Sequence, residues 1–150
     1  GDLPFGTDLH TALEESRAEK ARTGKPALVF VDFTGMTCTN CRYNEHNVFP
    51  RADVKELLKK FRLVQLYTDW VPEVAYKNSP SQTARAEEAE LNRNFQHNVF
   101  RTSQLPLYVI LEPLITGGVK VLGVYDEGKI NDPAGFAAFL RDALDAAANP

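Results

Sequence analysis

The chain has 150 residues, of which 43% are hydrophobic and 25% are charged, and its formal net charge is -3 at pH 7. This length suits one globular domain, so we expect a single domain over residues 1–150. Acidic and basic residues are interleaved, which argues against the clustered positive charge of a nucleic-acid-binding protein. No apolar run is long enough to cross a bilayer, so we expect no membrane insertion of this segment.

The opening residues, Gly1 to Phe5, lack the basic and apolar regions of a signal peptide. They fit a chain that starts after a cleaved leader or inside a longer polypeptide. The sequence by itself leaves both of these possibilities open.

The first quarter of the chain predicts a helix followed by a buried strand. Thr7 or Asp8 can cap the helix, and Gly24 with Pro26 ends it. The following run, residues 27–33, is β-prone and almost continuously apolar, which is typical of a strand covered on both faces.

Two helices are expected next. The first covers Cys38 to Val48 and is broken by Pro50. The second is indicated by four apolar residues at helical spacing: Val54, Leu57, Leu58 and Phe61.

The middle of the chain predicts a strand, an irregular segment and a helix. Leu63 to Tyr67 has the composition of a strand, and residues 69–81, with Trp70 and two prolines, are expected to be irregular and to offer a surface for a partner. Residues 83–96 favour a helix. Three of its apolar residues are expected on one face: Ala84, Leu91 and Phe95.

The last part of the chain predicts a hairpin and a final helix. Strands at 107–111 and 119–124 flank a turn that contains Gly117 and Gly118. Asp132 is expected to cap the last helix. Its apolar face is expected to contain Phe136, Phe139, Leu140 and Leu144. The element order is therefore α, β, α, α, β, α, β, β, α, an α/β class.

The two cysteines of the chain form a Cys-x-x-Cys motif, Cys38 and Cys41, at the predicted junction between strand and helix. They are most naturally each other's partner. Thiol exchange requires the thiolate, and unpaired N–H groups at a helix start favour that anion. We expect an exposed Cys38 to attack a partner disulfide and a shielded Cys41 to resolve the mixed disulfide.

Other readings of the motif fit the sequence less well. A zinc site needs four ligands, and the available histidines are His10, His46 and His97. Haem attachment requires a histidine directly after the second cysteine, where this chain has Arg42. A purely structural disulfide over so short a loop adds little stability.

The chain resembles the thioredoxin superfamily through Asp32 in its strand, the Cys-x-x-Cys that begins six residues later, and Leu105-Pro106 before a late strand. More narrowly, the segment 30–42, followed by Glu45, is similar to the C-terminal catalytic domain of DsbD-type thiol:disulfide interchange proteins. The resemblance implies a thioredoxin-like α/β fold with a central mixed sheet flanked by helices.

The same resemblance implies a monomeric protein-disulfide reductase that needs no cofactor beyond its redox-active cysteines. It also implies a periplasmic or otherwise exported location, with tethering to the membrane in the full-length chain. Electrons would come from a membrane-embedded partner domain and pass to exported acceptor proteins.

Several further residues are candidates for this site. A carboxylate within an apolar strand is costly to ionise, so the pKa of Asp32 should be raised and Asp32 can exchange a proton with Cys41. Glu45 lies one turn beyond Cys41 and can modulate the same site, although a solvated helix position is an equal alternative. The resemblance implies a cis bond between Leu105 and Pro106, with the Leu105 backbone pairing with substrate.

The remaining expectations concern the choice of partner protein and the direction of electron transfer. Thr37 stands where thioredoxins usually have tryptophan before the first cysteine, so the partner surface is less aromatic. The two residues between the cysteines do not determine the reduction potential, so a disulfide oxidase or isomerase stays an alternative. A second alternative is a thioredoxin-fold binding module without redox turnover.

Overall fold

The structure is a computed structural model that describes residues 3–73 and 81–148. Its elements in chain order are α1 (Leu9–Thr23), β1 (Val29–Thr34), α2 (Thr39–Asn47), α3 (Ala52–Leu58), β2 (Arg62–Tyr67), α4 (Gln82–Phe100), β3 (Leu107–Pro113), β4 (Val119–Tyr125) and α5 (Pro133–Ala148). This order is the one that the sequence predicts.

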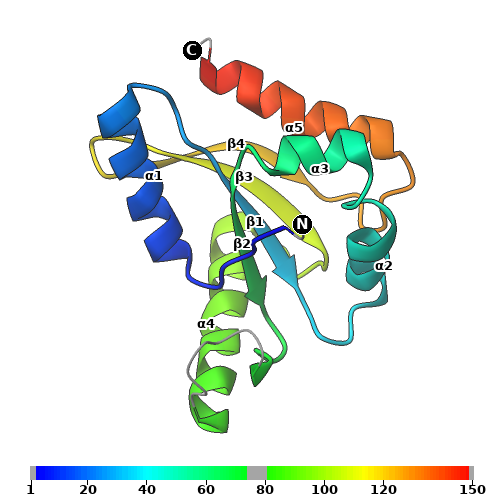
Figure 1. Cartoon of the computed structure of the whole chain (residues 1–150). Coiled ribbons are helices and arrows are strands. Elements are labelled where there is room, and N and C mark those ends of the chain that lie inside the picture. The colour runs from blue at the N-terminus through cyan, green and yellow to red at the C-terminus, as the bar shows by residue number, and fades with distance from the viewer. Residues whose placement is uncertain (1–2, 74–80, 149–150) are drawn as a thin grey trace.

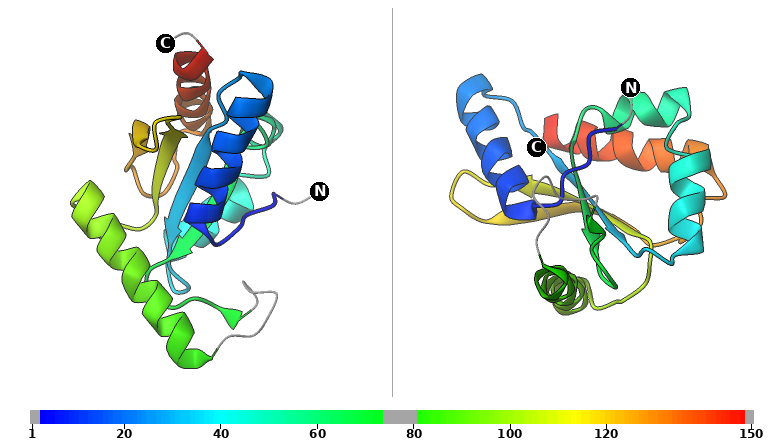
Figure 2. Two further views of the ribbon diagram at one scale, coloured as in Figure 1. Left: turned by 90° about the vertical axis from the view of Figure 1, so that its left-hand side faces the viewer. Right: turned by 60° about the horizontal axis from the view of Figure 1, so that its bottom comes forward.

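The strands of the described residues form one four-stranded mixed sheet in the order β2-β1-β3-β4. Strand β1 pairs with β2 in parallel, whereas β1 with β3 and β3 with β4 are antiparallel. Helices α1 and α4 lie on one side of the sheet, and α2, α3 and α5 lie on the other (Figures 1 and 2). The predicted α/β class, with a mixed sheet flanked by helices, is confirmed.

Each side of the sheet has its own apolar core, because neighbouring strand residues point to opposite faces. Phe30 and Tyr108 contribute to the core under α3 and α5. Val31, Phe33 and Val109 contribute to the core under α1 and α4. The central strand β1 is therefore buried on both faces over its whole length, as its apolar run predicts.

Local cap and turn chemistry is confirmed at three positions. Asp8 caps α1 by accepting a hydrogen bond from the backbone N–H of Thr11, at 3.2 Å. Gly24 closes the same helix with φ of 74°, and Gly117 in the β3–β4 turn has φ of 103°. Both angles lie in the region that residues with a Cβ avoid.

Helix α3 ends earlier than the apolar spacing predicts. It ends at Leu58, and the chain turns there because the N–H of Phe61 donates to the carbonyl of Leu58 at 3.1 Å. Phe61 is still buried, although its backbone is no longer helical.

The apolar face predicted for α4 is wrong in part, and the helix is longer than expected. Phe95 packs against the core under α1 and α4, as predicted. Ala84 and Leu91 are exposed, with Leu91 at 68%. The face toward the protein contains Ala89 and Gln96 instead. Polar side chains of α4 also reach toward the protein, because they hydrogen-bond backbone carbonyls at the end of β2 and in neighbouring loops; these donors are Arg85, Asn92, Arg93 and Gln96.

The structure describes part of the predicted irregular segment, residues 69–73 and 81. The expected partner surface also involves residues 74–80, which lie outside the described residues. Among the helices that are described, none has the length and apolar character needed to cross a bilayer.

Candidate active site

The cysteine pair lies where β1 passes into α2. Cys38 is the N-cap of α2, and its Sγ accepts a hydrogen bond from the N–H of Cys41 at 3.2 Å. The two form a disulfide with their Cα atoms 5.3 Å apart. Cys38 is half-buried, whereas Cys41 is 1% exposed. Cys38 is therefore the more accessible of the two residues and Cys41 is shielded, which is the order of exposure that the motif predicts.

Asp32 is fully enclosed within the sheet beside this junction. Its side chain is 1% exposed, and burial, together with the nearby charge of Glu45, raises its pKa to about 7. The side-chain amide of Gln65 opposes this shift by donating to Oδ2 at 3.1 Å. The other oxygen, Oδ1, has no hydrogen-bond partner among the described residues. The carboxyl group thus changes charge near neutral pH.

Glu45 and Arg42 lie on α2 next to the buried acid. Burial raises the pKa of Glu45, and the nearby Arg42 partly offsets that effect. Glu45 Oε2 and Arg42 Nη2 are 2.9 Å apart, and the same Arg42 nitrogen donates to Thr34 Oγ1 at 2.7 Å. Thr34 and Asp32 share one face of β1, so these contacts place the first turns of α2 over Asp32. The expected proximity of the two acids is present.

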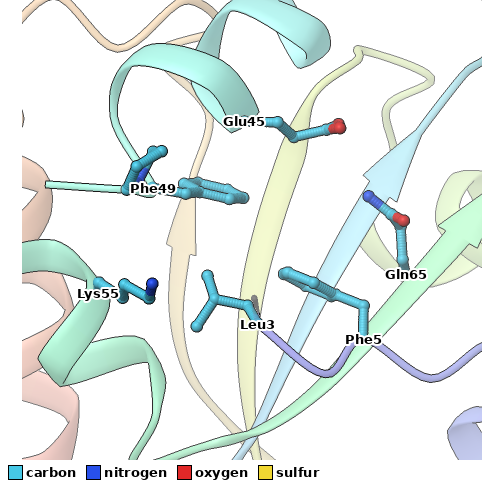
Figure 3. Close-up of a pocket in the computed structure, with 7 residues that line it drawn as sticks. Leu3, Phe5, Glu45, Phe49, Lys55 and Gln65 are labelled. Atoms are coloured by element: carbon cyan, nitrogen blue, oxygen red, sulfur yellow. The ribbon is translucent and has the colours of Figure 1, made fainter. Parts of the chain in front are cut away.

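A pocket of about 360 Å³ lies beside Glu45. Its lining comes from the segment before α1, from α2, α3 and β2. Figure 3 shows Glu45 and Gln65 on one side and Lys55 on the other, with apolar side chains of Leu3 and Phe5 at its base. Because Glu45 and Gln65 both act on Asp32, they connect the pocket to the buried carboxyl group.

The loop before β3 completes the surroundings of the cysteines. The Leu105–Pro106 peptide bond is cis, as the resemblance implies. The loop lies against the start of the motif, because a Cβ added to Gly35 would be 3.0 Å from Leu105 Cδ1. Thr37, directly before Cys38, is exposed. The predicted residues therefore come together at one end of the sheet.

Two buried polar residues around the site were missed by the sequence analysis. Asn44 donates to the Tyr108 hydroxyl at 2.9 Å and accepts from the N–H of Ile130 at 2.9 Å, joining α2 to β3 and to the loop before α5. Gln96 donates to the carbonyl of Gln104 at 2.7 Å, next to the cis bond. Both residues lie on helices rich in polar side chains, so no signal in the sequence distinguishes them from their exposed neighbours or identifies the distant partner.

Comparison with known families matches residues 8–113 to a model described as thioredoxin-like. The chain belongs to the thioredoxin-like family. No curated protein matches it. The matched residues contain the Cys-x-x-Cys, Asp32, Glu45 and the cis proline.

Solved structures share the thioredoxin-like fold at low sequence identity. A thioredoxin from Thermus thermophilus is 22% identical, with TM-score 0.61, over 91% of this chain and 84% of its own. A DsbH oxidoreductase is 16% identical, with TM-score 0.65, over 97% and 86%. A disulphide isomerase from Xylella fastidiosa Temecula1 is 17% identical, with TM-score 0.50, over 93% and 97%.

The geometry of this thioredoxin-like domain fits thiol:disulfide exchange. A helix start stabilises an anion on the half-buried sulfur of Cys38. Cys41 is close enough to form the intramolecular disulfide. Asp32 is an acid that changes charge near neutral pH. The geometry therefore suits exchange through the cysteine pair, with an ionisable acid in β1, the strand that leads into the motif.

Proposed function

We propose that this protein is a protein-disulfide reductase that passes electrons to partner proteins through Cys38 and Cys41. The observation that carries the proposal is the unequal burial of the two cysteines at the start of α2, because it supports attack by Cys38 and resolution by Cys41. The alternatives of an oxidase or isomerase, and of a non-catalytic binding module, become outcomes of the test.

The reaction proceeds in two exchanges. The Cys38 thiolate attacks one sulfur of a partner disulfide, which forms a mixed disulfide and releases the first partner thiolate. Cys41 then loses its proton and attacks the Cys38 sulfur, which closes the Cys38–Cys41 disulfide and releases the second partner thiolate. The partner gains two electrons, the domain loses two, and the released thiolates take up protons.

Asp32 is the proposed acceptor of the Cys41 proton. A buried carboxylate whose pKa is about 7 can take a proton at neutral pH and release it again afterwards. Glu45 is the proposed modulator, because its charge contributes to the raised pKa of Asp32. Leu105, Pro106 and Thr37 are the proposed contacts for the partner chain, since Thr37 directly precedes Cys38 and the cis-proline loop lies against Gly35 at the start of the motif.

The pathway is proposed from the resemblance to DsbD-type interchange proteins. The domain would work outside the cytosol, tethered to the membrane in its full-length form, and would take electrons from a membrane-embedded partner. It would return to the dithiol state through that donor and pass electrons to exported acceptor proteins. It would act as a monomer, without a cofactor beyond the cysteine pair.

The decisive experiment is the equilibrium reduction potential of the cysteine pair against glutathione or dithiothreitol, measured by thiol alkylation. A potential of about -220 to -270 mV, between glutaredoxins and thioredoxin, supports the reductase. A potential near about -120 mV would identify an oxidase. A pair that never closes would support the binding module, and partner binding that persists in Cys38→Ser would then be expected.

A further inference from the structure

Asp69 lies at the start of the segment between β2 and α4, and its exposed carboxylate binds the backbone of the loop before Cys38. Its Oδ1 accepts the N–H of Met36 at 3.0 Å and the N–H of Trp70 at 2.6 Å. Its Oδ2 lies 3.5 Å from the nitrogen of Thr37, a longer contact. A side chain distant in sequence thus holds the two residues that precede the nucleophile.

Gly35 shows how closely the segments around Asp69 approach each other. It is buried, and a Cβ added there would lie 2.9 Å from Asp69 Oδ2 and 3.0 Å from Leu105 Cδ1. The first distance is shorter than real Cβ contacts and the second is tighter than most, so a larger residue here would displace the Asp69 carboxylate and the Leu105 side chain. Three segments therefore meet at this residue: the loop before Cys38, the segment after β2 and the cis-proline loop.

The residues directly before and after Asp69 are both held in place by contacts with α4. Thr68 continues the parallel pairing of β1 and β2, and its carbonyl accepts from Arg93 of α4 at 2.8 Å. Trp70 on the other side lies under the guanidinium of Arg85, 5.0 Å from the ring centroid. With both neighbours fixed by α4, the carboxylate has a defined position from which to hold the loop.

We propose that Asp69 is a positioning residue for partner recognition: it preforms the loop Gly35–Thr37 as the surface on which a partner polypeptide lies while its disulfide reaches Cys38. Met36, 44% exposed, offers this surface an adaptable apolar side chain. The partner is an extended polypeptide with an apolar side chain beside its disulfide. A small disulfide, by contrast, needs to reach only the sulfur of Cys38 and does not use the loop surface. The inference rests on the proposed exchange activity.

The test compares a protein disulfide with a small one in Asp69→Ala, Asp69→Asn and the wild type. Asparagine keeps an acceptor oxygen for the loop N–H groups, whereas alanine has none. Asp142→Ala, on the exposed side of α5, is the matched control for loss of one surface acid. The protein substrate is disulfide-bonded insulin under excess reductant, and the small substrate is oxidised glutathione. Thermal unfolding of each variant verifies folding.

We expect Asp69→Ala to lower kcat/KM for insulin about tenfold, mainly through a higher KM, because a misplaced loop weakens docking. Its rate with oxidised glutathione should fall by less than about threefold, and Asp69→Asn should recover most of the insulin activity. Asp142→Ala should match the wild type with both substrates.

Other results would overturn the inference. An equal loss with both substrates would indicate a general structural role, and wild-type kinetics in Asp69→Ala would indicate that the loop needs no support. Failure of Asp69→Asn to recover activity would contradict the hydrogen-bond explanation. A wild type that exchanges neither disulfide would refute the proposed function instead, so the two failures are distinguishable.

Discussion

The amide of Gln65 and the carboxylate of Asp32 form a hydrogen bond of 3.1 Å between paired positions of β2 and β1. The Tyr67 hydroxyl extends this chain by donating to Gln65 Oε1 at 3.4 Å. Only one carboxylate oxygen of Asp32 has a hydrogen-bond partner among the described residues, so the charged form is incompletely compensated for its burial. Ionisation of Asp32 in this setting therefore destabilises the folded state, and a group that is so easily protonated is suited to proton transfer.

The first prediction concerns the cost of the Asp32 charge. Burial raises the pKa of Asp32 from 3.8 to about 7, so its ionised form destabilises the native state as the pH rises through this interval. Asp32→Asn cannot ionise and should increase the unfolding free energy above pH 7 by about 2–4 kcal/mol, since one pKa unit corresponds to about 1.4 kcal/mol. Below about pH 4 this gain in stability should vanish, because Asp32 of the wild type is then protonated and as neutral as the asparagine of the variant.

Urea unfolding of the oxidised proteins at several pH values measures this difference. The same variant should exchange disulfides more slowly, because the proposed proton acceptor is gone. A stability difference that does not change with pH would contradict the raised pKa of Asp32.

The second prediction concerns the coupling of Glu45 to Asp32. The charge of Glu45 raises the pKa of Asp32, so Glu45→Gln should lower it and shift the pH profile of disulfide exchange toward lower pH. Carboxyl NMR titration of Asp32 measures the same shift directly. Glu56→Gln, on α3 with a side chain 72% exposed, is the control and should leave both readouts unchanged. An unshifted Asp32 titration in Glu45→Gln would rule out the modulating role.

The third prediction concerns the buried amide of Asn44. Its side chain makes three hydrogen bonds with Tyr108, Gly128 and Ile130. Asn44→Ala leaves these groups without partners and should reduce the unfolding free energy by about 2–4 kcal/mol. Asn47→Ala in the same helix removes a single exposed bond and should cost less than about 0.5 kcal/mol. Chemical denaturation compares the two, and equal losses would contradict the structural role assigned to the buried hydrogen bonds of Asn44.

The fourth prediction separates the roles of the two sulfurs. Cys41 is 1% exposed, whereas Cys38 is half-buried. Cys41→Ser should therefore accumulate a mixed disulfide between Cys38 and a protein substrate, because the resolving thiol is absent. Cys38→Ser should form almost none. Intact-mass spectrometry after acid quenching counts the adducts, and adduct formation at Cys41 would reverse the assigned roles.

Much of the fold could be predicted because its signals are local in the chain. The apolar run around Val29 to Thr34 predicts a central strand, and Asp8 and Gly24 mark the ends of the first helix by their own cap chemistry. Helix α4 shows where such reasoning fails. Its inner face was assigned by apolar residues, but Gln96 is buried because a loop carbonyl requires a donor there.

The sequence by itself determined the chemistry: two cysteines at the spacing of an intramolecular disulfide, a carboxylate within an apolar strand, and the order of the elements. The tertiary structure decided what surrounds that chemistry. Asp69 reaches Met36, and Asn44 reaches Ile130, across 33 and 86 residues of sequence. Such contacts depend on strand register and on the direction of side chains after folding. No local pattern specifies either, because each partner alone is compatible with many environments.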